Sequence, residues 1–213
     1  MGKKVNPHSF RLGVNKAWNS KWYSPKKGYA TMIHADMNIR NLITKKAKSA
    51  GVDKIEIVRE ADKLTVNLTV GKPGIVIGRA GKDVDALKAD LAKLVGKPVN
   101  INILEVANPY LSATLVAQNI AEAMEKRILP KVIMSQQIEK IMSAGALGAK
   151  IMISGLGKKK QVGSEKKEAG RVPLSTIRAN IDYAKYEAKN LNEDNRKAGI
   201  RVWINLGEKM GFE

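Results

Sequence analysis

The sequence predicts an α+β protein built from two consecutive domains. Apolar residues first recur at helical spacing and then alternate as in strands, and this succession occurs twice along the 213 residues. A chain of this length has room for two domains of ordinary size, and its 44% of hydrophobic residues can form a core in each. We therefore expect helices and strands in both halves, with a boundary near Asn108-Pro109.

The first domain, predicted at residues 29–107, follows a basic N-terminal arm of residues 1–28 that shows little periodicity. A helix is expected at about residues 30–50, where apolar side chains form a stripe that Gly51 ends. Three strands are expected where apolar and polar residues alternate, at about 54–57, 63–70 and 99–104. Pro73 should open a short helical turn to Ile77, and a helix of about 82–95 should follow, so three helices would cover three strands.

The second domain, predicted at residues 108–213, begins with two helices. One carries apolar residues from Leu111 to Met124 and stops at Leu129-Pro130, and the other runs from Val132 to about Gly145. Short strands are expected at 150–154, 177–183 and 200–205. The cationic stretch at 155–160 is expected to be a flexible loop or a hairpin tip.

The most informative motif is the sequence Gly-x-x-Gly at residues 78–81, which follows an apolar run and precedes a helix. Its residues are Gly78, Arg79, Ala80 and Gly81, followed by Lys82. Two glycines let a backbone approach a phosphodiester closely, and the helix N-terminus behind them favours negative charge. This is the loop by which KH modules hold single-stranded nucleic acid. The alternative is a tight turn kept for its shape alone.

Charge supports a polyanionic partner. The net charge is +18, and residues 1–50 contain eleven Lys and Arg against one acid, Asp36. Nucleic acid is the partner that we favour over an anionic membrane surface or an acidic protein. The chain has no cysteine, no signal-like start and no apolar run of about 20 residues, which indicates a cytoplasmic protein without a membrane partner.

Catalysis has little support. The two histidines, His8 and His34, have no neighbouring residues in a triad or metal-ligand pattern, and the Walker A pattern fails at Val76 and Asp83. We therefore expect no enzyme activity, no metal and no cofactor. A lysine amine acting as a lyase nucleophile remains an alternative, although no residue marks one.

Four separated motifs resemble the bacterial small-subunit ribosomal protein S three family along nearly the whole chain, as a divergent member. They are the start at 2–14, residues 73–81 with the strand at 101–106, residues 170–184, and Val202-Trp203-Ile204. The resemblance implies a type II KH domain, then a C-terminal domain of two helices on an antiparallel sheet. It also implies a place in the head of the small ribosomal subunit, near where messenger RNA enters. The implied partners are small-subunit ribosomal RNA, messenger RNA on its path into the subunit, and neighbouring head proteins.

Two departures from the family concern charge. Val132 and Ser135 stand where the family commonly has basic residues thought to help open RNA duplexes, although three basic residues remain nearby. The family's glycine-rich turn after Ser154-Gly155 is replaced by lysines at 158–160.

We predict that RNA contacts come from the 78–82 loop and from exposed cations elsewhere. The candidate residues are Gly78, Arg79, Ala80, Gly81, Lys82, Lys72, Lys3, Lys4, Arg11, Lys126, Arg127, Lys131, Arg171 and Arg178. For Arg171 and Arg178 the rival role is pairing with Asp182 or Glu187. For Lys126, Arg127 and Lys131 it is a helix C-terminus that carries cations for its dipole. Trp18, Trp22 and Trp203 are expected to be core or anchor residues more than base-stacking ones.

The function predicted from these observations is that of a structural, RNA-binding component of the small ribosomal subunit head. The alternative is a free KH-domain regulator that binds RNA outside the ribosome.

Overall fold

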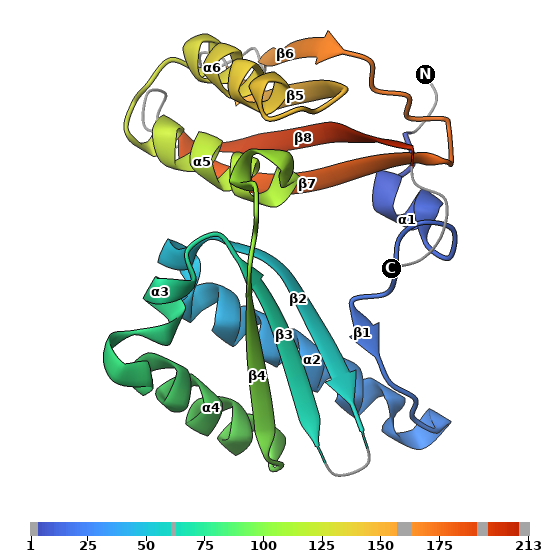
Figure 1. Cartoon of the computed structure of the whole chain (residues 1–213), viewed down its shortest axis with the longest axis vertical. Coiled ribbons are helices and arrows are strands. Elements are labelled where there is room, and N and C mark those ends of the chain that lie inside the picture. Colours follow the sequence, from blue (N-terminus) through green and yellow to red (C-terminus); the bar gives the residue numbers. More distant parts are fainter. Residues whose placement is uncertain (1–3, 61–62, 157–162, 191–195, 209–213) are drawn as a thin grey trace. The chain divides into compact units, whose positions relative to one another are not determined.

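The computed structural model describes residues 4–60, 63–156, 163–190 and 196–208 (Figure 1). Two units account for the chain: one consists of residues 18–107, and the other joins residues 1–17 to residues 108–213. The first 28 residues, expected as one arm, are thus divided between the units. Helix α1 (Pro7–Arg11) lies in the second unit, and strand β1 (Ser20–Lys21) lies in the first.

The unit of residues 18–107 is built on a sheet whose strand order is β1-β2-β3-β4. Strands β2 (Val52–Arg59) and β3 (Leu64–Val70) are antiparallel, and β3 is parallel to β4 (Val99–Glu105). These are the three predicted strands. The two-residue β1 adds a fourth at the edge, parallel to β2.

The helices of this unit pack on one face of its sheet (Figure 1). Helix α2 (Lys26–Lys46) contributes Ile39 and Ile43, and α4 (Lys82–Val95) contributes Leu87 and Leu91; all four side chains are buried against alternate residues of the strands. Helix α2 begins and ends about four residues earlier than expected, because a short 3-10 helix, Lys48–Ala50, separates it from Gly51. The predicted limits of α3 (Pro73–Ile77) and α4 agree with the structure.

The other unit has an antiparallel sheet of order β6-β5-β8-β7, covered on one face by helices α5 (Ala113–Glu125) and α6 (Pro130–Ser143). The strands are β5 (Gly148–Leu156), β6 (Gly163–Gly170), β7 (Ala179–Asn190) and β8 (Arg196–Glu208). Strand β6 was not predicted, because its sequence, GSEKKEAG, contains no β-branched or aromatic residue. Of the predicted cationic loop, Gly155 and Leu156 belong to β5, and residues 157–160 lie outside the described residues.

The second face of this sheet carries a smaller apolar cluster around Ile181 and Trp203, and α1 lies against β7 (Figure 1). Both features come from residues far apart in the sequence.

Within the described residues, no helix combines the length and the apolar character that crossing a membrane requires. The α+β class and both sheet-and-helix domains are as predicted.

Candidate nucleic-acid interface

The Gly78–Gly81 loop joins α3 to α4 in the unit of residues 18–107. Gly78 has φ +69° and Gly81 has φ +78°, a region of backbone conformation that L side chains rarely adopt. Gly78 N–H donates to the carbonyl of Gly74 at 3.0 Å, which ends α3, and Gly81 immediately precedes the first residue of α4. The loop therefore presents backbone next to the N-terminus of a 14-residue helix, where free N–H groups favour an anion.

The two glycines meet different surroundings. A Cβ added at Gly78 would collide with the side chain of Asp83, whereas a Cβ at Gly81 would meet nothing within 4 Å. Gly78 is thus required by both backbone conformation and space, and Gly81 by conformation alone. The open space beside Gly81 is where a sugar-phosphate chain could approach. The side chain of Ala80, also a predicted contact, lies outside the part of the chain that the structure describes.

Three predicted cations surround this loop, and all are exposed: Lys72, Arg79 and Lys82. None of them forms an ion pair with another described residue, so their charge is available to a ligand. Beside them, the side chains of Ile75 and Ile77 on α3 are 48% and 42% exposed. Sequence reasoning missed these two as surface residues, because an apolar run before a helix is more often core.

A second basic group lies at the turn between α5 and α6. Lys126, Arg127 and Lys131 are all exposed, and Lys131 Nζ lies 3.7 Å from Glu165 Oε1. Arg127 has φ +62° and is the one non-glycine among the described residues with positive φ. Ile128 N–H donates to the Ala123 carbonyl, which closes the helix end around this left-handed residue. Glycine adopts this conformation more readily than arginine, so Arg127 occupies the turn at some cost in stability.

The same turn gains a cation that the sequence did not indicate. Lys167 of β6 donates to Ser135 Oγ at 2.6 Å, and Ser135 Oγ in turn donates to the Lys131 carbonyl at 2.9 Å. Lys167 thus places positive charge next to Ser135, one of the positions where the resemblance led us to expect a basic residue. No sequence signal could have found Lys167, because its position depends on the unpredicted strand β6.

A third group is the segment of residues 171–178 between β6 and β7, which carries Arg171 and Arg178. Both side chains are exposed. Their rival partners are engaged elsewhere: Asp182 bonds to His8 and to the Ala113 N–H, and Glu187 lies 3.6 Å from Lys197. The two arginines are therefore available to a ligand.

Arg11 is placed differently from the other candidates, because its side chain is fully buried. Its guanidinium donates to five backbone carbonyls, at distances of 2.7–3.3 Å: those of Pro7, Pro173, Leu174, Thr176 and Ala179. Burial lowers the pKa of this arginine. A guanidinium enclosed in this way cannot reach a phosphate, so we remove Arg11 from the interface and assign it the positioning of the 171–178 segment.

Asp182 connects α1 and the start of α5 on the same side of this unit. Its carboxylate lies 3.2 Å from His8 Nε2 and accepts from the Ala113 N–H at 2.7 Å, at the first residue of α5. Burial raises the pKa of Asp182, but the hydrogen bonds from His8 and Ala113 and the charge of Lys16 outweigh burial and hold the pKa below its usual value. Asp182 is a structural carboxylate.

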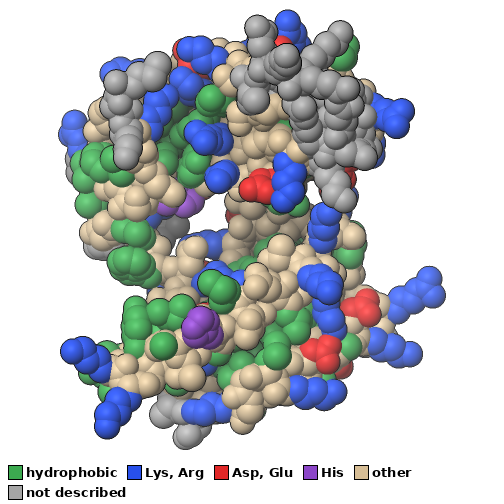
Figure 2. Space-filling view, turned by 180° about the vertical axis from the view of Figure 1, so that it is seen from behind, with side chains coloured by type: hydrophobic (Ala, Val, Ile, Leu, Met, Phe, Trp, Pro, Cys, Tyr) green, Lys and Arg blue, Asp and Glu red, His purple; other side chains and the backbone are tan. Residues whose placement is uncertain are grey.

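Two further candidates, Lys3 and Lys4, lie at the start of the chain. Lys3 lies outside the described residues, and Lys4 is exposed. Figure 2 shows more Lys and Arg than Asp and Glu side chains on the visible surface of each unit. Within the described ranges, no three His, Asp or Glu side chains are close enough together to hold a metal ion. The candidate interface thus consists of exposed cations on helices, strands and the turns between them.

Two families of known proteins match consecutive parts of this chain. The family model described as KH domain matches residues 38–111, and the model described as Ribosomal protein S3, C-terminal domain, matches residues 120–204. The first match contains the glycine loop, and the second contains the turn between α5 and α6 and the 171–178 segment.

Three relatives that match nearly the whole of this chain are named small ribosomal subunit protein uS3. The chain is 46% identical to that of Clostridioides difficile strain 630 over 210 residues, which cover 98% of this chain and 76% of the relative. It is 43% identical to that of Pseudomonas aeruginosa strain PAO1 over 212 residues, 99% of this chain and 92% of the relative. The relative in Rhodopirellula baltica is 43% identical over 213 residues, 97% of this chain and 89% of the relative.

Proposed function

The chain belongs to the uS3 family of small ribosomal subunit proteins, and from this premise we propose that it holds small-subunit ribosomal RNA through the cationic groups described above. It is a structural RNA-binding protein of the ribosome and not an enzyme. Its work is positioning and charge neutralisation. Phosphate contacts would provide most of the affinity, and the folded elements would fix where those contacts are made.

The observation that carries this proposal is the glycine loop between α3 and α4. Two glycines with positive φ, the N-terminus of α4 and the exposed cations Lys72, Arg79 and Lys82 lie next to one another along the chain. Each of these features favours a phosphate, and together they form a site that can follow a backbone of several nucleotides. The exposed Ile75 and Ile77 offer an apolar surface beside it for bases.

We propose further that the protein lies in the head of the small subunit, beside other head proteins and near where messenger RNA enters. The cations at the α5–α6 turn support this location, since the resemblance implies that basic residues in this region line the messenger path. Lys126, Arg127 and Lys131 would contact passing RNA, and Lys167 would supply part of the charge that Val132 and Ser135 do not.

Sedimentation tests the proposal directly. Cell extract is separated on a sucrose gradient, and the protein is measured by quantitative immunoblotting against small-subunit RNA. We expect about one copy per small subunit in the small-subunit, whole-ribosome and polysome fractions. A protein found mainly near the top of the gradient would instead be a free KH regulator.

Salt dependence tests the mechanism separately. If about six phosphates are contacted, the logarithm of the affinity for ribosomal RNA should fall with the logarithm of salt concentration with a slope of roughly −4 to −5. Nearly salt-independent binding would contradict phosphate neutralisation even if the protein sediments with ribosomes.

A further inference from the structure

The face of the β6-β5-β8-β7 sheet that lies opposite α5 and α6 carries a row of basic side chains across its strands. Lys166 of β6 is paired with Met152 of β5, Met152 with Arg201 of β8, and Arg201 with Lys185 of β7. Neighbouring strands are about 4.8 Å apart, so this basic row of Lys166, Arg201 and Lys185 spans about 14 Å. None of the three is among the RNA-binding candidates considered above.

Burial shows which way these side chains point. Their strand neighbours Ile151, Ala184 and Val202 are buried in the core beneath the helices, and Lys167 contacts α6 through Ser135. Successive side chains of a strand alternate between its two faces, so the basic row projects from the face opposite the helices. All three of its side chains are exposed there.

The acidic side chains next to the basic row already have partners. Glu168, two residues along β6, accepts from Lys150 Nζ at 2.6 Å. Glu187, two residues along β7, lies 3.6 Å from Lys197 Nζ. Among the described residues, no member of the basic row forms an ion pair. Its charges are therefore left for a partner outside the unit.

Such a row is unfavourable for the sheet by itself. Arg201 and Lys185 are direct cross-strand neighbours, and like charges in that position repel each other and destabilise the pairing of the strands. A polyanion lying along the row would remove this repulsion. The basic row thus favours a bound anion rather than the fold.

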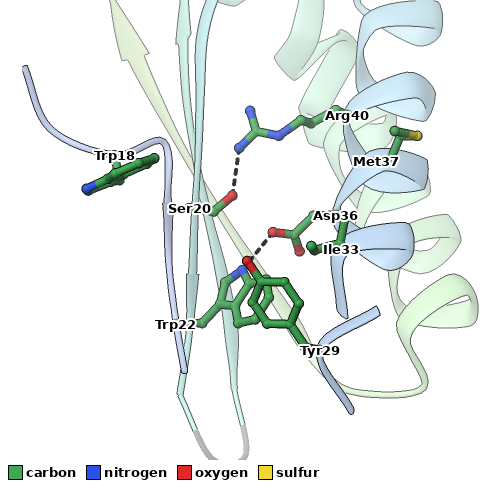
Figure 3. A pocket seen from close by; sticks show the side chains of 8 residues that line it. All are labelled: Trp18, Ser20, Trp22, Tyr29, Ile33, Asp36, Met37 and Arg40. Atoms are coloured by element: carbon green, nitrogen blue, oxygen red, sulfur yellow. Dashed lines mark hydrogen bonds between the residues drawn. The ribbon is translucent and has the colours of Figure 1, made fainter. Parts of the chain in front are cut away.

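A cation that supports the fold of this protein has acceptors in the protein, as Arg40 of the other unit shows. Arg40 lies in the wall of a groove of about 400 Å³, where Trp18 is 65% exposed and is not the core residue that we expected. The Arg40 guanidinium donates to the carbonyls of Ile55 and Asn19 and to Ser20 Oγ, at 2.8–3.0 Å (Figure 3). The basic row has no such acceptors among the described residues.

The surroundings of the basic row leave room for a chain to lie along it. The adjacent positions on β6, β5 and β8 are Ser164, Ser154 and Gly199, so no large side chain stands on that side. On the other side Trp203 is buried, and little apolar surface is offered to a protein partner. The centres of protein interfaces are enriched in aromatic residues and depleted in lysine, whereas phosphate contacts are made mainly by lysine and arginine.

From these observations we infer that the basic row is a separate RNA site, which binds the phosphates of a sugar-phosphate backbone that crosses the strands of the β6-β5-β8-β7 sheet. RNA supplies a negative charge at every nucleotide and can therefore neutralise several cations of one row. The inference rests on the proposed function for the identity of this RNA as small-subunit ribosomal RNA.

Removal of charge tests the basic row in the full chain. Lys166→Gln, Lys185→Gln and Arg201→Gln are combined, and the affinity for small-subunit RNA is measured by filter binding at a series of salt concentrations. If each cation contacts one phosphate, the slope of the logarithm of affinity against the logarithm of salt concentration should become shallower by about 2–3.

The matched control removes three exposed charges from α2 and α4 of the other unit, by Lys27→Gln, Lys45→Gln and Lys93→Gln. Its net charge equals that of the row variant, so general attraction to RNA falls equally in both. We expect its slope to change by less than about 1. Equal slopes in the two variants would overturn the inference, whereas salt-independent binding by the unaltered chain would count against the proposed function.

Thermal unfolding separates a binding role from a structural one. Because Lys185 and Arg201 repel each other, Lys185→Gln alone should keep or raise the melting temperature. The same variant should make the salt slope shallower by about 0.7–0.9. A marked fall in melting temperature would show that Lys185 supports the fold, and it would overturn its assignment to an RNA site.

A photo-crosslinker identifies what lies on the basic row in the particle. The chain has no cysteine, so Ser164→Cys places a single thiol beside the row. Benzophenone-4-maleimide is attached to this thiol, small subunits are reconstituted from ribosomal RNA and the other small-subunit proteins, and the irradiated adduct is mapped by mass spectrometry. We expect an adduct with ribosomal RNA. An adduct with protein alone, or no adduct, would contradict the inference.

Discussion

The glycine loop at residues 78–81 and the segment at residues 171–178 both present exposed arginines, but the chain builds them in different ways. The shape of the loop depends on its own backbone, because two glycines with positive φ and the helices on either side determine it. The segment depends on Arg11, about 160 residues away in the sequence, whose buried guanidinium binds three carbonyls within it and a fourth at Ala179.

The difference teaches that two exposed cationic segments can be held in shape in different ways. A loop between two helices is held by local conformation, so a substitution there should disturb only the loop. A longer segment without repeating structure must have its carbonyls satisfied by a distant side chain, so its failure should spread through the unit. The predictions below test that distinction, from the largest expected effect to the smallest.

Arg11→Ala should be the most damaging change. It leaves several buried carbonyls without donors, and we expect a loss of about 3–5 kcal/mol in the free energy of unfolding of the unit that contains α1. Hydrogen exchange at β7 and β8 under increasing urea measures this loss. The lysine of an Arg11→Lys variant keeps the charge but cannot reach all the carbonyls, so this variant should recover only part of the lost free energy of unfolding. A stability equal to that of the unaltered chain would break the comparison.

Arg79→Asp combined with Ala80→Asp should act on binding instead of folding. Two carboxylates placed against phosphates should lower the affinity for ribosomal RNA by about 30–100-fold, or about 2–3 kcal/mol, with almost no change in melting temperature. Filter binding and thermal unfolding check the two parts. Lys93→Asp with Ala89→Asp makes the same change in net charge on the exposed side of α4, and it should lower the affinity for ribosomal RNA much less. Unchanged affinity in the loop variant would remove the loop from the interface.

The Asp182 carboxylate should make the stability of its unit depend on pH. Its pKa is lower in the folded than in the unfolded chain, so its contribution is complete above the usual value of 3.8 and is lost as the pH falls through the lower folded value. Asp182→Asn should cost about 2 kcal/mol at neutral pH and reduce the acid dependence. Urea unfolding at a series of pH values provides the measurement; identical pH profiles would contradict the assignment.

The two glycines of the loop should respond unequally to alanine. Gly81→Ala should cost about 1–2 kcal/mol, because it forces a left-handed alanine into open space. Gly78→Ala should cost more, because its ψ of −174° lies in a region that only glycine adopts readily and because its methyl group also meets Asp83; adding Asp83→Ala should recover only the part due to the contact. A double variant no more stable than Gly78→Ala alone would show that the Asp83 contact is unimportant.

Arg127→Gly should have the smallest effect, and it should stabilise the protein instead of destabilising it. Glycine removes the strain of a left-handed arginine and should raise the free energy of unfolding by about 0.5–1 kcal/mol. Affinity for RNA should fall slightly at the same time if the side chain contacts RNA. A variant that gains stability and keeps full affinity would show that Arg127 is not part of the interface.

Much of the fold could be predicted wherever structure depends on neighbours in the sequence. The limits of α3 and α4 and the placement of the glycine loop agreed, because proline, glycine and helical periodicity act over a few residues. Strand β6 could not be predicted, since pairing with β5 overrides its poor strand propensity. The division of the first 28 residues between the two units could not be predicted either, because α1 and β1 are too short to show a periodic pattern.

Within the candidate site, the sequence identified the exposed cations at both turns but not their supporting contacts. Arg11 was expected at the RNA surface because arginine is usually exposed, and only its surroundings reveal otherwise. Lys167 could not be identified from the sequence, because only the folded chain brings it into hydrogen-bond contact with Ser135.

By itself the sequence determined the family, the order of helices and strands, the strong positive charge and the glycine loop, because each of these is encoded in residues that are close together or in the composition. Tertiary structure alone decided which cations are buried, which aromatic side chains remain exposed and which distant segments share a surface. The physical reason is that burial and hydrogen-bond partners depend on what packs around a side chain, and those neighbours come from parts of the chain that only folding brings together.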